Sequence, residues 1–168
     1  MAGTQQYASR DYKFYMRRYG TDDDAAQLVK DLEVDFPGLV CQAAAGLGSK
    51  GSPKNIYYEE YAESEETRVY IPDTVCLDST EIELKFVFLG EDRRETYDSF
   101  FDYVSAGKIK YWDTARNRLV HIVLDAATEP DEDVLKGGTH YIIAAFTFRN
   151  LFGRSYRCDN SGNVIGND

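Results

Sequence analysis

The stretch from Thr80 to Leu89 constrains the fold most strongly, because its apolar residues recur at every second position while Glu81, Glu83 and Lys85 fall on the other side. The apolar side chains at every second position are Ile82, Leu84, Phe86 and Phe88. Successive side chains of a β-strand point to opposite faces, so a half-buried strand requires this period of two. The sequence therefore predicts a strand here with one face in a hydrophobic core.

After Gly90 the pattern changes to that of an amphipathic helix. The apolar side chains that would share one helix face are Tyr97, Phe100, Phe101 and Val104. Asp92, followed three positions later by Glu95, matches a capping box, in which side chains accept the free amides of the first turn. The sequence predicts one flanking amphipathic helix over about 92–106.

Other alternating or β-branched runs predict the rest of the sheet. The expected strands are 11–20, 39–45, 67–71, 80–89, 108–113, 118–125 and 139–148. A short turn joins 108–113 to 118–125, which predicts a hairpin. Segment 21–35 is ambiguous, because Thr21 or Asp22 could also begin a short helix carrying Leu28, Val29 and Leu32. The predicted fold class is mainly β (α+β): a β-sandwich or open barrel of about seven strands with one flanking helix.

A chain of 168 residues is long enough for one domain with its own core, and we expect a single domain over residues 1–168. Residues 1–9 are small and polar and predict a loose N-terminal arm. Residues 154–168 are rich in Asn and Gly and predict a C-terminal tail that frays. Residues 126–138 predict an acidic loop.

The charge balance argues against partners that carry negative charge. The chain has 19 basic and 29 acidic residues, a formal charge of −10, so no broad basic footprint for nucleic acid or anionic membrane exists. No apolar run approaches membrane-spanning length, and no membrane association is expected. The three widely spaced cysteines, Cys41, Cys76 and Cys158, predict free thiols of a reducing compartment.

No catalytic constellation is visible in the sequence. The only histidines, His121 and His140, lie in apolar runs without nearby cysteines, whereas a zinc site needs three or four convergent ligands. We therefore predict no catalytic residue, no metal site and no cofactor. Two alternatives stay open from the residues alone: a β-barrel module that binds a small ligand inside, and an enzyme using a carboxylate pair.

Two segments offer candidates for a contact with another chain. Tyr57, Tyr58 and Tyr61 follow a glycine-rich loop, 46–53; they could pack on a strand, or they could form an aromatic patch that meets a partner, since tyrosine is enriched at protein interfaces. At the predicted hairpin tip, Trp112, Asp113, Arg116 and Arg118 could bind a small anion or form an ordinary charged surface. The candidate subunit-interface residues are Lys50, Tyr57, Tyr58, Tyr61, Trp112, Asp113 and Arg116.

The order of elements from Thr80 to Gly153 resembles a known family. Its landmarks are Phe88-Leu89-Gly90-Glu91, a helix with Phe100-Phe101, a hairpin with Tyr111-Trp112-Asp113-Thr114, a strand with Phe146-Thr147-Phe148, and Leu151-Phe152-Gly153. This order is similar to that of the N-terminal domain of tailed-phage distal tail proteins and of the related tail-tube proteins.

The resemblance implies a structural, non-enzymatic component of a phage or prophage tail: tube, distal tail (baseplate) or adaptor. It implies a homo-oligomeric ring, a hexamer, around a channel through which DNA passes without specific binding. Other tail proteins would be its partners, and its place would be the virion tail after synthesis in the bacterial host cytoplasm. Six copies would carry a formal charge of about −60 (six times −10), and such an acidic bore would repel the DNA backbone and let it slide.

Overall fold

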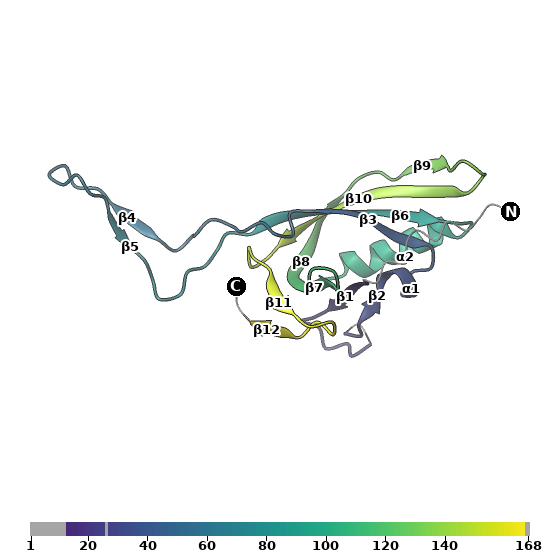
Figure 1. The fold of residues 1–168 in the computed structure, drawn as a ribbon, viewed down its shortest axis with the longest axis horizontal. Coiled ribbons are helices and arrows are strands. Elements are labelled where there is room, and N and C mark those ends of the chain that lie inside the picture. The colour runs from purple at the N-terminus through teal and green to yellow at the C-terminus, as the bar shows by residue number, and fades with distance from the viewer. Residues whose placement is uncertain (1–12, 26, 167–168) are drawn as a thin grey trace.

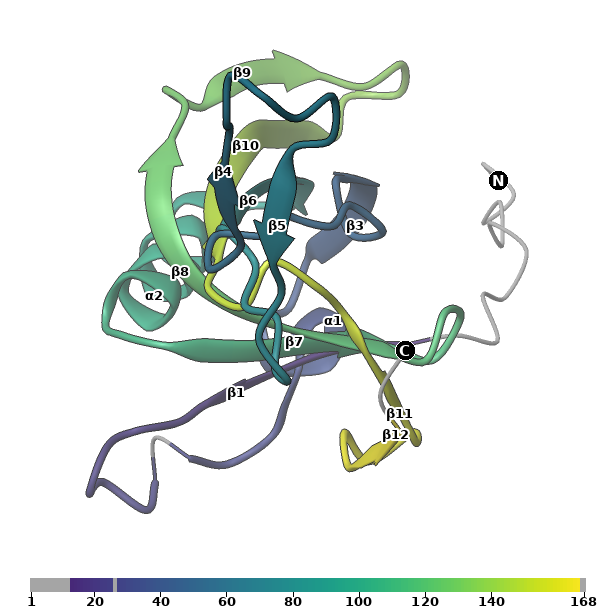
Figure 2. The ribbon, with the colours of Figure 1, turned by 90° about the vertical axis from the view of Figure 1, so that its left-hand side faces the viewer.

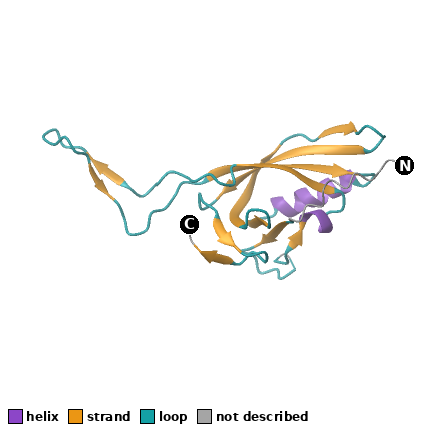
Figure 3. Ribbon diagram, in the orientation of Figure 1, coloured by secondary structure: helices purple, strands orange, loops and turns teal. Residues whose placement is uncertain are grey.

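The computed structural model describes residues 13–25 and 27–166, and in it a curled antiparallel sheet encloses a helix. Figure 2 is seen from one end of the molecule and shows the curl: β10 and β6 lie in the upper half below β9, β8 curves along the left side, and β7 and β1 cross the lower half. A thin two-stranded arm projects from the end of the body that lies opposite the helices (Figures 1 and 3).

Neighbouring strands of the main sheet follow the order β2-β1-β7-β8-β10-β6-β3. The bounds in this order are Lys30–Asp31, Phe14–Arg18, Ile109–Asp113, Arg118–Ala127, His140–Asn150, Thr80–Leu89 and Leu39–Ala45. Three more strands extend it: β9 (Asp131–Val134) pairs with β10, and β11 (Tyr156–Cys158) joins β8 to β12 (Val164–Gly166). The separate pair consists of β4 (Tyr57–Glu59) and β5 (Arg68–Tyr70). The helices are α1 (Leu32–Asp35) and α2 (Arg93–Ser105).

The predicted strand 80–89 is confirmed as β6, and it lies deep in the sheet. It pairs with β10 from Leu89↔Tyr141 to Thr80↔Asn150, and its other edge pairs with β3. The four alternating apolar residues, Ile82, Leu84, Phe86 and Phe88, are each at most 2% exposed. The period of two therefore identified the buried face correctly.

Helix α2 closes the core through one aromatic ring. Phe100 is fully buried, and its ring contacts those of Phe36, Phe86 and Phe146 at centroid distances of 5.2, 4.8 and 5.2 Å. These partners come from three separate segments, so one side chain joins α2 to both central strands and to the chain after α1. The described sheet stays open rather than closing into a barrel, and aromatic side chains fill its interior.

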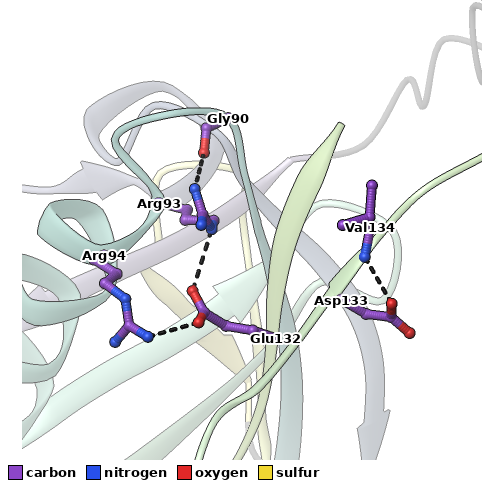
Figure 4. Close-up of polar contacts among 6 residues, drawn as sticks. All are labelled: Gly90, Arg93, Arg94, Glu132, Asp133 and Val134. Atoms are coloured by element: carbon purple, nitrogen blue, oxygen red, sulfur yellow. Dashed lines mark hydrogen bonds and ion pairs between the residues drawn. The ribbon is translucent and has the colours of Figure 1, made fainter. Parts of the chain in front are cut away.

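The capping box predicted at the start of α2 is wrong. Asp92 stands at the N-cap, but its side chain makes no capping hydrogen bond; its carbonyl accepts the Thr96 amide at 3.0 Å instead. Charge pairing holds this end of the helix. Glu132 of β9 lies 3.3 Å from Arg93 Nε and 2.6 Å from Arg94 Nη2, and Arg93 also donates to the Gly90 carbonyl (Figure 4). The β9–β10 hairpin is thereby tied to α2.

Two loop predictions differ from the structure. The helix considered for 21–35 shrinks to the single turn of α1, and Leu28 and Val29, expected on its apolar face, are 62% and 45% exposed. The acidic loop 126–138 contains strand β9, because β10 continues past β8 and leaves an edge that Asp131–Val134 pairs with. The predicted loose N-terminal arm (1–9) lies outside the described residues.

The C-terminal segment packs against the body from residue 156 onward, in contrast to the frayed tail expected for 154–168. Trp112 is 1% exposed, stacks on Tyr15 at 5.5 Å and donates from Nε1 to the Asn160 carbonyl at 3.2 Å. Gly162, at φ 82°, lies directly on the indole: an added Cβ would be 2.7 Å from it. Together with Leu119 and Cys158, Trp112 forms a second, small core that β11 and β12 cover.

All three cysteines are free in the structure. Cys41 and Cys158 are buried like small apolar residues, whereas Cys76 is exposed. Burial, followed by the nearby carboxylates of Asp159 and Asp113, raises the pKa of the Cys158 thiol to about 11. This thiol therefore stays protonated at neutral pH.

Candidate interaction interface

Among the described residues, the largest group of exposed apolar side chains lies on the hairpin arm, which we define as residues 54–76. Its strands pair only over Tyr57↔Tyr70, Tyr58↔Val69 and Glu59↔Arg68. The large side chains along it are exposed over about half or more of their surface: Tyr57 70%, Tyr58 69%, Tyr61 48%, Val69 46%, Tyr70 53% and Ile71 63%. Figure 1 shows the arm reaching away from the body, so its two strands leave these side chains uncovered.

The root of the hairpin arm is held by backbone hydrogen bonds to the body. The Gly51 amide donates to the Gly153 carbonyl at 2.8 Å, and the Asp78 amide donates to the Ser52 carbonyl at 2.8 Å. Just beyond, the Asn55 side chain bridges the two strands, donating to the Thr74 carbonyl and accepting the Cys76 amide, both at 2.8 Å. The direction of the arm is thus fixed where it leaves the sheet.

Replacing Gly51 with alanine is expected to disrupt this root. An added Cβ would overlap the carbonyl oxygen of Asp78, so the backbone must shift and its hydrogen bonds weaken. We expect the free energy of unfolding to fall by about 1–3 kcal/mol, measured by chemical denaturation. Gly48→Ala is the matched control, because a Cβ there meets nothing within 4 Å. Equal stability of the two variants would contradict the close approach.

Side chains also order the tip of the hairpin arm. The Tyr61 hydroxyl donates to a Glu59 carboxylate oxygen at 2.6 Å, and this hydrogen bond is the main reason that the pKa of Tyr61 is raised. The Arg68 guanidinium lies 5.0 Å from the centre of the Tyr61 ring, in cation–π geometry. The tyrosine at the tip is therefore held in a defined orientation although it is exposed.

The other candidate residues divide into two groups. Lys50 and Arg116 are exposed, and both line one hollow of about 380 Å³ beside the arm root, together with Arg118 and Ser155. Trp112 and Asp113 are each 1% exposed, so their side chains offer no surface to a neighbour. Asp113 instead accepts the Arg116 amide at 2.7 Å and pairs with its guanidinium at 3.2 Å. The interface candidates that the structure leaves accessible are Lys50, Tyr57, Tyr58, Tyr61 and Arg116.

A further surface, which the sequence did not predict, lies on the outer side of β1, β7 and β8. We define the basic aromatic face as Tyr19, Lys108, Lys110, His121, Phe152 and Tyr156. The two lysine ammonium groups lie 5.8 and 5.5 Å from the centre of the Tyr19 ring. The His121 ring is central, with the rings of Tyr19, Phe152 and Tyr156 at 5.4, 4.6 and 5.7 Å. Because these residues come from five separate segments, no local motif revealed them.

The charge of the basic aromatic face comes from lysine and not from histidine. Burial, reinforced by nearby Lys110, lowers the pKa of His121 from 6.5 to about 4. Its Nδ1 is buried and has no hydrogen-bond partner within the described residues, which also suits a neutral ring. At neutral pH, His121 therefore contributes only aromatic surface.

His121 is expected to make folding sensitive to acid. Between pH 6.5 and pH 4 the unfolded chain binds a proton at His121 that the folded chain does not, so stability falls as the pH falls through this window. Allowing for the ring's partial exposure, we expect His121 to account for a fall of about 1–2 kcal/mol in the free energy of unfolding over this pH range. Urea unfolding of the wild type and His121→Phe at pH 7 and pH 4.5 measures it, and carboxylates common to both chains cancel in the comparison. An equal loss of stability in both proteins would refute the lowered pKa of His121.

The outer side of β3, β6 and β10 carries an open groove of about 710 Å³. Its lining is largely apolar and includes Val40, Val87, Leu89, Leu135, Tyr141 and Ile143. Within the described residues, no group of three or more His, Cys, Asp or Glu side chains is arranged to hold a metal ion. Neither described helix has the length and apolarity needed to cross a bilayer.

Comparison with known proteins rests on structure, since no protein-family model and no curated protein sequence matches this chain. A chain in the baseplate of phage p2, in its activated conformation with strontium, superposes with a TM-score of 0.51 at 16% identity, over 80% of this chain and 43% of that one. This chain has the fold of a phage baseplate protein. The resemblance to tailed-phage tail proteins is thus confirmed at the level of the fold.

Two further structures are similar at lower TM-scores. The Dit protein of phage SPP1 gives 0.48 at 15% identity, over 86% of this chain and 52% of that one. The SPP1 tail tube gives 0.36 at 17% identity, over 94% and 87%. This chain spans about half the length of the p2 and Dit chains that it matches.

Proposed function

We propose that this chain is a structural, non-enzymatic component of a phage or phage-like tail, whose copies assemble as a ring around a DNA channel. The observation that carries the proposal is the hairpin arm: large apolar side chains project on a fixed root, away from the body that could bury them. Contiguous exposed apolar surface of this kind typically marks a site of contact with another protein.

The fold supports the same function, because it is shared with a chain of a phage baseplate. Strand edges offer a second means of assembly: β3 and β2 end the main sheet, and an unpaired edge is a template for a strand of a neighbouring chain. A hexameric ring would contact other tail proteins above and below. Lys50, Arg116 and the arm tyrosines Tyr57, Tyr58 and Tyr61 are the proposed contact residues.

The net charge suits a channel. A hexamer would carry a formal charge of about −60 (six times −10), and an acidic lining repels phosphate, so DNA would pass without being held. The virion tail is accordingly the proposed location. Tube, distal tail and adaptor roles all agree with this ring.

Electron microscopy of the concentrated full chain tests the proposal. We expect annular particles, and light scattering should give a mass several times that of one chain, rising with concentration. The control is a chain in which residues 57–71 are replaced by a short Gly-Ser turn, which should remain folded and lose most of this association. A wild-type chain that stays monomeric at every concentration would overturn the proposal, and rings that are unaffected by removing the arm would exclude the arm as the contact that builds them.

A further inference from the structure

The hairpin arm and the basic aromatic face are complementary in charge. Residues 57–71 contain five glutamates, Glu59, Glu60, Glu63, Glu65 and Glu66, against the single basic residue Arg68, a formal charge of −4 (one minus five). The side chains of all six are exposed. The same stretch contains the exposed tyrosines Tyr57, Tyr58, Tyr61 and Tyr70, so the arm presents rings and carboxylates together.

The basic aromatic face offers the matching groups. Lys108 is exposed, Lys110 is half-buried, and Arg17 lies directly opposite Lys110 in the β1–β7 register, on the same side of the sheet. The ion pairs found within the described residues involve other basic side chains, so these three positive charges remain available. Phe152, 49% exposed, extends the apolar part of the face.

The nearest acidic run in the sequence does not neutralise this face by direct pairing. Asp22, Asp23 and Asp24 follow Gly20 in the loop after β1, and all are exposed. Asp23 accepts the Ala25 amide at 3.0 Å, so its carboxylate is used within its own turn. In a chain with a net charge of −10, the face is therefore a local basic site.

We propose that the hairpin arm of one copy docks on the basic aromatic face of the next copy. The proposal rests on the proposed ring and names its contact. A second copy is the occupant because both complementary surfaces belong to every chain, while the arm points away from its own body (Figure 1). Such a contact is heterologous, with different surfaces on its two sides, and repetition around an axis closes a ring. Tyr61 would stack among the aromatic rings while the glutamates meet the lysines.

Two complementary variants isolate this contact from any pairing of sheet edges. The first lacks the arm (residues 57–71 replaced by a Gly-Ser turn) and keeps the face. The second keeps the arm and carries Lys108→Glu with Lys110→Glu. Mixed, they should form a 1:1 complex by analytical ultracentrifugation, because one supplies the arm and the other the face. This complex should weaken as salt is added.

The decisive comparison changes the face of the armless partner. With Lys108→Glu and Lys110→Glu added to it, we expect binding to weaken at least about tenfold, because like charges then face the glutamates. Lys136→Glu is the matched control, an exposed lysine on the β9–β10 turn, and should bind as before. Binding should return when the arm-bearing partner keeps its native face and carries Glu63→Lys, Glu65→Lys and Glu66→Lys on its arm, which also shows that the reversed face is folded.

Unchanged binding to the reversed face, or no rescue by the reversed arm, would overturn the docking proposal. If annular particles still form in that case, the proposed ring stands and another contact builds it. If arm and face bind one another but annular particles never form, the ring is wrong while the docking holds.

Discussion

Phe100→Ala should lower the free energy of unfolding by about 3–5 kcal/mol, because truncating a fully buried phenylalanine leaves a cavity as well as losing apolar burial. The cavity would open where the rings of Phe36, Phe86 and Phe146 meet α2. A domain of this size is stable by only about 5–15 kcal/mol, so the variant would keep a small margin. Urea denaturation followed by circular dichroism measures the change.

Phe101 provides the control within the same helix. It is 36% exposed and its ring lies 6.5 Å from that of Tyr97, so Phe101→Ala should cost less than about 1 kcal/mol. The sequence pattern alone placed both phenylalanines on the apolar helix face. Similar losses for the two variants would mean that α2 does not pack as the structure shows.

Trp112→Ala is expected to lower the free energy of unfolding by about 3–5 kcal/mol and to release the C-terminal hairpin. The indole carries three contacts that alanine cannot make: the stacking on Tyr15, the hydrogen bond to the Asn160 carbonyl and the close packing under Gly162. Because Trp112 is the only tryptophan, its fluorescence reports directly on this small core. Deleting residues 155–166 should therefore shift the emission to longer wavelength as water reaches the ring.

Trp112→Phe distinguishes packing from the hydrogen bond, since it keeps a ring and loses the indole N–H; it should cost about 1–2 kcal/mol. If the C-terminal tail were frayed and did not pack on Trp112, the opposite results would be expected. In that case Trp112→Ala would cost little, and deletion of residues 155–166 would leave the fluorescence unchanged.

Local periodicity predicted the central part of this fold. The alternation in 80–89 and 139–148 identified β6 and β10, and the spacing of Phe100 and Val104 identified the buried side of α2. These segments are long and bury only one face, so their apolar residues repeat at a single spacing. The order of the same segments also supported the resemblance to phage tail proteins.

The elements that the sequence missed depend on distant partners. Asp131–Val134 is too acidic to read as a strand, yet it pairs with the free edge of β10 and joins α2 through Glu132. Tyr156–Cys158 shows no strand pattern in the sequence, and it becomes a strand because it pairs with β8 and packs Cys158 against Trp112. For the same reason the sequence predicts Trp112 and Asp113 as interface residues: hairpin tips are normally exposed, whereas here the C-terminal hairpin covers Trp112, and Asp113 lies on the other side of β7 near Phe14 and Cys41.

The candidate interface was half visible in the sequence. A cluster of tyrosines beside a glycine-rich loop can be recognised locally, and the structure places it on the hairpin arm. The basic aromatic face could not be recognised, since its six residues are separated in the sequence and gather only when β1, β7 and β8 pair. His121 gave no signal, because a histidine in an apolar run resembles any half-buried strand residue.

The strand order bears on how the chain folds as it leaves the ribosome. β1 lies between β2 and β7, and β3 pairs with β6, so the nascent chain carries unpaired strands until the sequence beyond the arm has been made. The tyrosines at 57–61 emerge during this interval with no folded body behind them. Glutamates stand between and after these tyrosines, and charge beside an exposed aromatic stretch opposes the association of unfinished chains.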